Sequence, residues 1–321
     1  MNILVVGGAG YIGSHVCKAL KEAGFHPIVY DNLSNGHSWA VKWGPLVEGD
    51  LSNPQALDEV FTTYQPKGVI HLASSIDVKE SMANPDKYYQ NNVEGTRHLL
   101  EAMVRHKVDQ IVFSSTAAVY GRPQQVPIPE DHPCEPINVY GKTKWLAEQL
   151  LSEFPLRSVS LRYFNAAGAD ESAEIGEAHT VETHLIPVAI FAALGKNPLK
   201  VFGIDHPTPD GTPIRDFIHV SDLAQAHVLA LQWLQKGGTK IALNLGSGNG
   251  YSVQEVIAAI ELEIGPVPHE IAPRNPYDPP ALVADISLAQ KTLNWSPQKS
   301  DLATIISSAV KWHQMQETVK K

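Results

Sequence analysis

The stretch VVGGAGYIGSH, residues 5–15, places Gly7, Gly10 and Gly13 at regular spacing between an apolar run and a segment of helical periodicity. In a dinucleotide-binding turn, the first glycine permits the tight turn and the second lets the backbone approach a pyrophosphate. The third lets the helix pack on the strand. The N-terminus of that helix then offers free N–H groups to the phosphates. An ordinary glycine-rich connection between a strand and a helix is the alternative interpretation.

An acidic residue stands where a dinucleotide site requires one. Asp31 ends the next apolar run, HPIVYD, and its carboxylate can accept hydrogen bonds from the ribose hydroxyls of an adenosine. The same charge would repel a 2′-phosphate, so the sequence favours NAD over NADP as the cofactor. Asp50, at the end of the third apolar run, could contact the adenine, although a solvated strand end is an equal alternative.

Apolar runs and helical segments alternate through the first half of the chain. Strands that are apolar along their whole length, separated by helices, are typical of a parallel sheet covered on both faces. The sequence therefore predicts an α/β fold with a doubly wound, Rossmann-type parallel sheet. The expected strands are 2–7, 26–31, 45–50, 68–73, 110–115 and 158–165, and the expected helices are 11–24, 53–64, 85–107 and 140–154.

The composition changes after Asn165, where acidic and proline-rich loops become frequent. We expect an NAD-binding Rossmann domain at residues 1–165 and a smaller C-terminal α/β substrate lobe at 166–321. The lobe is expected to include the apolar runs LKVFGI and IALNLGSG. Residues 215–235, which contain the amphipathic stretch VSDLAQAHVLALQWLQ, are expected to rejoin the first domain.

Bulk composition argues against several classes of protein. The net charge of −9 is unsuited to a nucleic-acid surface, and no apolar window reaches the roughly 18 residues that a membrane span needs. Two cysteines and the lack of a basic, apolar leader predict a cytoplasmic protein. The 14 histidines are scattered, with no HExxH motif and no tight cluster with carboxylates in view, so we expect no metal.

A tyrosine and a lysine lie four residues apart in NVYGKTKWLAEQ, residues 138–149. The spacing places Tyr140 and Lys144 on one helical face, and Ser114 and Thr116 end the preceding strand, so all four can meet at the carboxyl edge of the sheet. A tyrosine base near neutral pH needs its pKa lowered by about three units, roughly 4 kcal/mol. We expect the positive charges of Lys144 and oxidised nicotinamide to supply this, while Thr116 holds a substrate hydroxyl.

These motifs together resemble the extended short-chain dehydrogenases/reductases, and segment by segment the chain is similar to the UDP-glucose 4-epimerase family. The most discriminating stretches are YFNAAGA (163–169) and DGTPIRDFIHV (210–220), and the resemblance covers nearly the whole chain. It implies that Tyr140 takes the proton from the sugar 4-hydroxyl while hydride moves from C4 to tightly bound NAD. The 4-keto sugar then rotates about its link to the pyrophosphate, and hydride returns to the opposite face of the sugar. UDP-glucose and UDP-galactose would thereby interconvert.

The resemblance also implies site residues by position. The catalytic residues would be Tyr140, Lys144 and Thr116. The NAD-binding residues would be Gly7, Gly10, Tyr11, Ile12, Gly13, Asp31, Asn32, Leu33, Asn35, Gly36, Asp50, Leu51, Leu72, Ala73, Ser74, Asn91, Ser114, Tyr140, Lys144 and Tyr163. The UDP-sugar-binding residues would be Thr116, Phe164, Asn165, His184, Leu185, Lys200, Phe202, Arg215, Phe217, Val253, Arg274, Asp278 and Leu282. Ordinary core packing or surface ion pairing is the alternative for several of them, including Phe202, Val253 and Arg215.

Three positions depart from the family's pattern. Asn275 follows Arg274 where the family commonly has a second arginine, which leaves one phosphate contact open. Thr116 replaces the serine of some members and keeps the hydroxyl. Leu282 stands where some members have a tyrosine near the sugar, and its smaller side chain could admit an N-acetyl group. We therefore expect turnover of UDP-N-acetylglucosamine as well.

Other functions remain open at this point. A 4,6-dehydratase would need an additional acid/base pair after Thr116, where this chain has Ala117 and Ala118. A UDP-glucuronate epimerase or a decarboxylase would favour an added basic group in the sugar pocket. A non-catalytic NAD-binding regulator would keep the glycine turn and lose Tyr140 or Lys144, both of which are present.

The resemblance also implies a homodimer formed through the helices at 85–107 and 140–154. Both carry apolar stripes, for which burial against the sheet is the alternative. The stripes are Leu99, Leu100 and Met103 on the first helix, and Trp145, Leu146 and Leu150 on the second.

Overall fold

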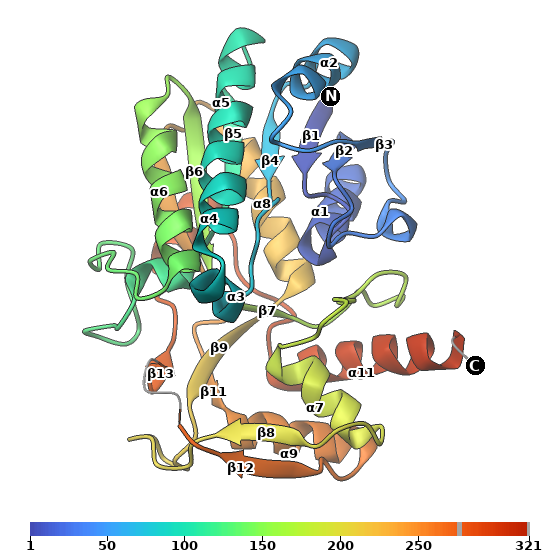
Figure 1. Ribbon diagram of the computed structural model, residues 1–321, viewed down its shortest axis with the longest axis vertical. Coiled ribbons are helices and arrows are strands. Elements are labelled where there is room, and N and C mark those ends of the chain that lie inside the picture. The colour runs from blue at the N-terminus through green and yellow to red at the C-terminus, as the bar shows by residue number, and fades with distance from the viewer. Residues whose placement is uncertain (275–277, 320–321) are drawn as a thin grey trace.

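A computed structural model describes residues 1–274 and 278–319 as a large domain with a smaller lobe below it (Figure 1). The large domain is built on a seven-stranded parallel sheet in the order β3–β2–β1–β4–β5–β6–β10. Its strands are β1 (Asn2–Val6), β2 (His26–Asp31), β3 (Leu46–Glu48), β4 (Val69–His71), β5 (Gln110–Thr116), β6 (Arg157–Tyr163) and β10 (Ile241–Leu245).

The strand order reverses between β1 and β4. In open α/β sheets, ligands bind beyond the carboxyl ends of the strands at such a reversal. The predicted doubly wound parallel sheet is therefore confirmed, and its ligand crevice is expected on the side of the sheet that faces the lobe.

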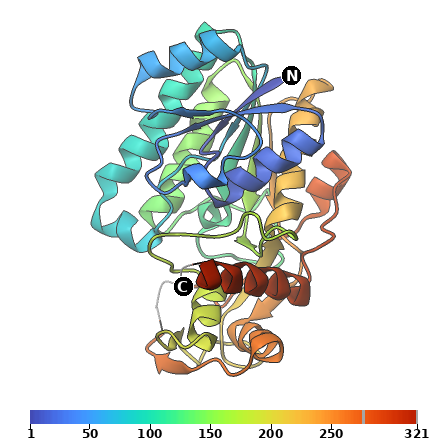
Figure 2. The same ribbon diagram turned by 90° about the vertical axis from the view of Figure 1, so that its right-hand side faces the viewer.

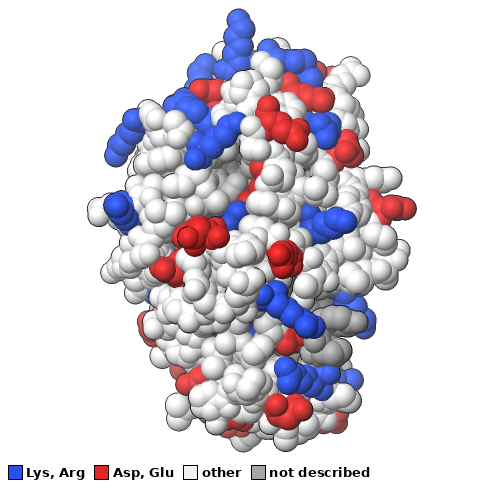
Figure 3. Space-filling model, turned by 90° about the vertical axis from the view of Figure 1, so that its left-hand side faces the viewer, with Lys and Arg blue, Asp and Glu red and all other residues white. Residues whose placement is uncertain are grey.

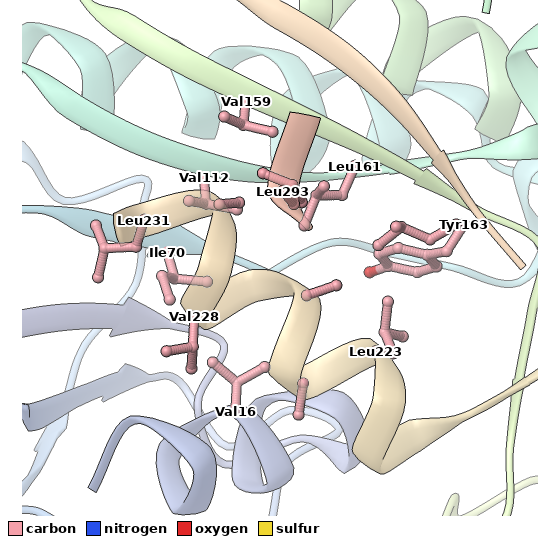
Figure 4. Packing of buried hydrophobic residues seen from close by; sticks show 14 of the residues in the cluster. Val16, Ile70, Val112, Val159, Leu161, Tyr163, Leu223, Val228, Leu231 and Leu293 are labelled. Atoms are coloured by element: carbon pink, nitrogen blue, oxygen red, sulfur yellow. The ribbon is translucent and has the colours of Figure 1, made fainter. Parts of the chain in front are cut away.

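Helices cover both faces of this sheet, as the alternation of apolar runs predicted. On one face, α1 (Tyr11–Glu22), α8 (Val220–Gln235) and α10 (Ser287–Leu293) contribute to one buried cluster with the strands. Figure 4 shows Val16 of α1 beside Val228 of α8, with Leu231 of α8 nearer to Ile70, all below strand residues such as Val112. The other face is covered by α2 (Pro54–Tyr64), α5 (Gly95–Arg105) and α6 (Val139–Glu153).

Local sequence signals account for several element ends. Asn53 caps α2 because its side chain accepts from the N–H of Ala56, and Pro54 occupies the first helical turn. Gly24 follows α1 with a φ of +84°, a left-handed conformation that glycine adopts without strain. These ends agree with the predictions from sequence.

The expected helix at 85–107 is continuous but irregular. It consists of α4 (Pro85–Tyr88), a π-helical turn η2 (Tyr89–Glu94) and α5, and it is preceded by α3 (Val78–Ala83). Asn92 in the π turn accepts from the N–H of Ser75 at 2.8 Å and donates to Thr143 of α6 at 3.1 Å. A π turn often accompanies a functional site, and this one ties α6 to the chain that follows β4.

The lobe contains a small sheet of β7 (Asn165–Ala167), β9 (Ile214–His219), β11 (Gly250–Ser252) and β13 (Ala281–Leu282), and a parallel pair of β8 (Leu199–Phe202) with β12 (His269–Ala272). Three helices, α7 (Leu185–Ala193), α9 (Val253–Ile264) and α11 (Leu302–Val319), enclose its core. α11 runs across the boundary between the domain and the lobe in both Figure 1 and Figure 2.

The sequence placed one strand in the wrong layer. IALNLGSG was assigned to the lobe, yet β10 pairs in parallel with β6 at the edge of the large sheet. A fully apolar run is equally suited to either sheet, so its composition could not decide between them. Of the expected segment 215–235, α8 contributes to the core cluster of the large sheet, whereas β9 belongs to the lobe sheet.

The apolar stripe on the helix at 85–107, which was expected to form part of a dimer interface, is buried in the core of the single chain. Leu99, Leu100 and Met103 are fully buried against the sheet, and Leu150 is almost fully buried. Only Trp145 and Leu146 of the named set remain partly accessible. Among the described residues, no helix is long and apolar enough to cross a membrane.

Candidate active site

The glycine turn between β1 and α1 has the geometry that the spacing predicted. Gly7 has a φ of +84°, and a Cβ there would lie 2.5 Å from the backbone nitrogen of Ala73. A Cβ on Gly13 would lie 2.1 Å from the carbonyl oxygen of Gly7, so the helix can pack on the turn only without one. α1 begins after Gly10 with no side-chain cap. Its first N–H groups are therefore available to an anionic ligand.

Asp31 is held in place by the turn that it faces. One carboxylate oxygen accepts from the N–H of Ala9 at 2.9 Å and the other from the N–H of Leu33 at 2.8 Å. Burial raises the pKa of this carboxyl, and the two backbone hydrogen bonds act in the opposite direction. Each oxygen retains a lone pair that a ribose hydroxyl could use.

Asp50 is also fixed by neighbouring donors. It accepts from the side chain of Asn32 at 2.6 Å and from the N–H of Ser52 at 2.8 Å. Burial alone would raise the pKa of the Asp50 carboxyl, but these hydrogen bonds outweigh it and lower the pKa. The predicted adenine contact would thus come from an ionised and well-ordered end of β3.

A cavity of about 910 Å³ lies at the carboxyl edge of the large sheet and reaches the lobe. Its volume is at the upper end of the range for ligand sites, about 300–1,000 Å³, as a pair of nucleotides would require. Its walls include the glycine turn, Asp31, the ends of β4 and β5, the start of α6 and parts of the lobe. The cavity brings together segments from both ends of the chain.

Tyr140 enters this cavity from the first turn of α6. Asn138 caps the helix by accepting from the N–H of Gly141 at 2.7 Å, and the hydroxyl of Ser81 accepts from the N–H of Tyr140 at 3.2 Å. The side chain of Thr116, at the end of β5, lies near enough to the phenol to lower its pKa in part. Tyr140 and Thr116 therefore line the same cavity, and their expected catalytic roles stay predictions.

Lys144 lies one turn further along α6 and is 2% exposed. Its ammonium donates to the hydroxyl of Ser74 at 3.4 Å and lies 4.5 Å from the centre of the Phe113 ring. The hydroxyls of Ser114 and Tyr163 are hydrogen-bonded to each other beside it, on neighbouring strands. Polar groups from β4, β5, β6 and α6 thus converge on one end of the cavity.

The titration of these groups differs from the expectation. Burial raises the pKa of Tyr140 to about 12, and the hydrogen bond with Thr116 offsets only part of that rise. Burial also lowers the pKa of Lys144 to about 7, against the opposing effect of Glu148. The expected lowering of the tyrosine pKa is therefore not supplied by the protein's own groups, because desolvation disfavours both charged forms.

Comparison with known proteins decides the family. The model of the NAD dependent epimerase/dehydratase family matches residues 3–246. The chain belongs to this family. The UDP-glucose 4-epimerase of Rhizobium meliloti (strain 1021) is 52% identical over 319 residues, covering 97% of each protein.

Solved structures in this epimerase/dehydratase family superpose closely. The UDP-glucose 4-epimerase from Brucella ovis in complex with NAD matches with a TM-score of 0.94 at 49% identity, covering 97% of both chains. The UDP-Glc/GlcNAc 4-epimerase from Campylobacter jejuni matches with a TM-score of 0.86 at 39% identity, covering 98% of this chain and 99% of that one. The likeness therefore extends over the lobe as well as the sheet.

The cavity collects nearly all of the predicted NAD-binding residues of this family member. Leu33 is the exception, since it packs against the core beside the cavity. The predicted residues that line the cavity are Gly7, Gly10, Tyr11, Ile12, Gly13, Asp31, Asn32, Asn35, Gly36, Asp50, Leu51, Leu72, Ala73, Ser74, Asn91, Ser114, Tyr140, Lys144 and Tyr163. Their individual contacts with NAD stay predictions.

The predicted UDP-sugar residues divide into two groups. Those that line the cavity are Thr116, Phe164, Asn165, His184, Asp278 and Leu282. The others lie outside its wall. Leu185 begins α7 and Val253 begins α9. Phe217 is buried in the lobe core, whereas Lys200 and Phe202 on β8, and also Arg274, are exposed. Asn275 lies outside the described residues.

Arg215 forms an ion pair with Asp278 on the lobe side. Its guanidinium also donates to the carbonyl of Ile214 at 2.7 Å. The sequence analysis assigned Arg215 to the pyrophosphate and Asp278 to the ribose of UDP. A bound diphosphate would have to compete with Asp278 for this guanidinium, so both roles stay predictions.

One group of residues was missed from the sequence. The expectation that no histidine clusters tightly with carboxylates is wrong, because Glu177, His179, Glu182 and His184 present ligand-type atoms within 4.8 Å of one another. Burial would lower the pKa of each imidazole, but the two carboxylates outweigh it, raising the pKa of His179 to about 9 and that of His184 to about 10. The available signal was the segment GEAHTVETH, in which acidic and imidazole residues recur at short intervals.

Proposed function

We propose that the protein interconverts UDP-glucose and UDP-galactose by inverting C4 of the hexose, with NAD as a resident cofactor. The observation that carries this proposal is that Tyr140, Thr116 and the buried Lys144 line the same cavity as the glycine turn. Relatives at up to 52% identity that bear the name UDP-glucose 4-epimerase support it. An epimerase needs no second cofactor site, because its reaction has no net oxidation.

The residues present fit NAD. The Gly7 turn leaves room for a pyrophosphate, the start of α1 has uncapped N–H groups, and Asp31 faces the place where a ribose would lie. When bound, NAD would supply reversible hydride exchange with the sugar carbon. Lys144, Tyr140 and the Ser114–Tyr163 pair line the same cavity, and we place the meeting of sugar and cofactor beside them.

Tyr140 is the proton carrier in this proposal, and Thr116 holds the 4-hydroxyl within its reach. Bringing the phenol from a pKa of about 12 into the neutral range requires about 7 kcal/mol, at roughly 1.4 kcal/mol per unit. A cation about 4 Å away contributes about 4 kcal/mol in a protein-like dielectric. Lys144 alone is therefore insufficient, and a second positive charge is needed. Tyr140 would act as a base only when oxidised nicotinamide is also present.

A second candidate substrate is a UDP-N-acetylhexosamine. Leu282 lines the cavity with a side chain smaller than tyrosine, and the relative from Campylobacter jejuni bears the name UDP-Glc/GlcNAc 4-epimerase. By contrast, Ala117 and Ala118 also line the cavity. Neither alanine can act as the additional acid or base that a 4,6-dehydratase requires.

The direct experiment is incubation with UDP-galactose, UDP-glucose and their N-acetyl counterparts, without added cofactor, followed by chromatographic separation of the products. We expect interconversion within each pair. Protein that retains NAD and yet turns over none of these sugars would contradict the proposal and support a non-catalytic regulator.

We also propose a cytoplasmic homodimer. The partly accessible Trp145 and Leu146 on α6 offer an apolar contact area, and nucleotide sugars and NAD are cytoplasmic metabolites. The face shown in Figure 3 carries acidic and basic side chains scattered over wide uncharged areas, with no continuous basic stripe. Light scattering at micromolar concentration should give twice the mass of 35.0 kDa, and a monomer mass would contradict the dimer.

A further inference from the structure

Four side chains meet at one point in the segment between β7 and α7. Glu177, His179, Glu182 and His184 each contribute one ligand-type atom, and these atoms lie within 4.8 Å of one another. Two carboxylates and two imidazoles form a donor set that divalent transition metals accept. We propose that this Glu–His cluster binds a single divalent transition-metal ion, and that zinc fits it best.

The spacing of the donor atoms is close to that of a tetrahedral site. The Nδ1 atom of His179 lies 3.2 Å from Glu177 and 3.3 Å from Glu182. The Nδ1 atom of His184 lies 2.8 Å from Glu177 and 2.9 Å from Glu182. A tetrahedral zinc ion with ligands at about 2.0–2.1 Å separates them by about 3.3–3.4 Å. The two distances to Glu182 end on different oxygens, so this carboxylate would present one of them to the ion. The His–Glu distances would lengthen slightly, and any wider pair within the 4.8 Å set would draw closer.

Ion pairs between the two imidazoles and the two carboxylates do not by themselves explain this arrangement. Each Nδ1 carries at most one proton, yet each faces oxygens of both Glu177 and Glu182. A single N–H cannot point well at two acceptors on different residues. An ion at the centre would instead satisfy all four atoms at once.

An ion would also leave the charge of the cluster balanced. A metal ligand imidazole has no proton on the ligating nitrogen, so a divalent ion would take the place of the Nδ1 protons of His179 and His184 beside Glu177, which is only 5% exposed. Glu177, His179 and His184 line the same cavity as the start of α1, where the proposed function places phosphates. Exchange of two protons for one divalent ion adds no negative charge beside those phosphates. This charge argument rests on the proposed function, whereas the geometric argument does not.

The surroundings indicate a positioning role for the ion. Residues 168–184 contain no helix or strand, and loops of such length in compact domains are commonly functional. The carbonyl groups of the segment accept from Tyr11 at 2.6 Å and Trp312 at 2.8 Å, and His37 contacts it at 2.7 Å. An ion in the cluster would close this segment on itself and fix it against the cavity wall.

One carboxylate is already oriented by the backbone. An oxygen of Glu182 accepts from the N–H groups of Thr183 and His184, both at 2.8 Å. Metal-binding carboxylates are commonly held by such outer hydrogen bonds, which fix the direction of the remaining lone pairs. Glu182 does not line the cavity, so its substitution tests the metal site with the least disturbance of the proposed substrate site.

The test uses untagged full-length protein, stripped with a chelator and titrated with Co²⁺ while visible absorption is recorded. We expect about one equivalent per chain, with the intense bands of a four-coordinate ion, and displacement by Zn²⁺. Glu182→Gln should abolish these bands. His106→Asn is the matched control, since His106 pairs with Asp58 alone at 2.8 Å outside the cluster and should leave the bands unchanged. Mass spectrometric metal analysis of the protein as purified gives the ion bound in the cell.

Circular dichroism confirms that each variant is folded, and His179→Gln replaces Glu182→Gln should the latter fail to fold. No Co²⁺ binding, or only the weak bands of a six-coordinate ion, would overturn the proposal. Identical Co²⁺ spectra for the wild type and a folded cluster variant would do the same. None of these measurements uses catalysis, so they stand or fall separately from the epimerase assay.

Discussion

The proposed cofactor side and the proposed sugar side of the cavity are built differently. On the cofactor side, Gly7 follows β1 and Asp31 ends β2, and hydrogen bonds with the backbone hold both. On the sugar side, Asp278 and His184 are carried by segments outside long helices and strands, and ion pairs hold them. A rigid backbone scaffold suits a cofactor that stays bound. Side chains on loops suit a sugar that must change its orientation.

This contrast predicts that substitutions on the two sides fail in different ways. Substitutions at the carboxyl edge of the sheet should lower the rate of turnover or weaken the binding of NAD. Changes in the lobe should alter which sugar is used.

The largest effect should follow Tyr140→Phe. Removal of the phenolic hydroxyl eliminates the proposed proton carrier, and general acid–base groups contribute about 10²–10⁴-fold to rate. We expect kcat for UDP-galactose to fall by that factor while NAD stays bound, as measured by product chromatography and cofactor absorbance. Tyr64→Phe is the control, because Tyr64 ends α2 and packs against the sheet core away from the cavity. Equal activity of the two variants would remove Tyr140 from the mechanism.

Asp31→Asn should weaken NAD retention by about 10- to 100-fold, since a hydrogen bond to a charged group contributes about 1.5–3 kcal/mol. The loss of negative charge should also narrow the preference for NAD over NADP. Equilibrium dialysis with each cofactor measures both effects. Asp58→Asn, at a surface ion pair with Arg105, should change neither. An unaltered dissociation constant of NAD for the Asp31 variant would show that the Asp31 carboxylate does not bind the ribose.

Leu282→Tyr probes the sugar side. The larger ring should narrow the cavity, and a steric mismatch of this size is worth about 1–3 kcal/mol. We expect kcat/KM for UDP-N-acetylglucosamine, relative to UDP-glucose, to fall about tenfold or more, with NAD retention unchanged. Leu262→Tyr on α9 is the control, because Leu262 is 90% exposed. A ratio that does not move would place the N-acetyl group elsewhere.

The smallest effect concerns stability. Burial lowers the pKa of Lys144 to about 7 from 10.5, so between these values the unfolded chain holds a proton that the NAD-free folded protein has lost. The free energy of unfolding should therefore rise with pH across this window, by up to about 1.4 kcal/mol per pH unit from this group. Below pH 7 the buried charge destabilises the fold by its full amount.

Urea unfolding of NAD-free wild type and Lys144→Met, at about pH 7.5 and 8.5, measures that difference. The variant should lack the lysine's part of the slope. Identical slopes would mean that Lys144 stays charged when buried, which would contradict the lowered pKa of its ammonium.

The same contrast explains what the sequence could predict. The glycine turn and the Tyr140–Lys144 pair are set by local spacing, because a strand, a turn or one helical turn fixes the distance between the residues. β10 was assigned to the wrong sheet because its apolar run has no feature that distinguishes the two. The Glu–His cluster depends on the path of residues 168–184, which no helical or strand period determines. The pKa of Tyr140 depends on desolvation by the whole fold, which spacing does not reveal.

The central claim is that the hydrogen at C4 leaves the sugar and returns to the same carbon without exchange with water. UDP-glucose deuterated at C4 is incubated with the purified protein and no added cofactor, and the UDP-galactose formed is analysed by mass spectrometry and proton NMR. The account predicts that the product retains deuterium at C4. Loss of the label to solvent, with epimerised product still formed, would contradict the account.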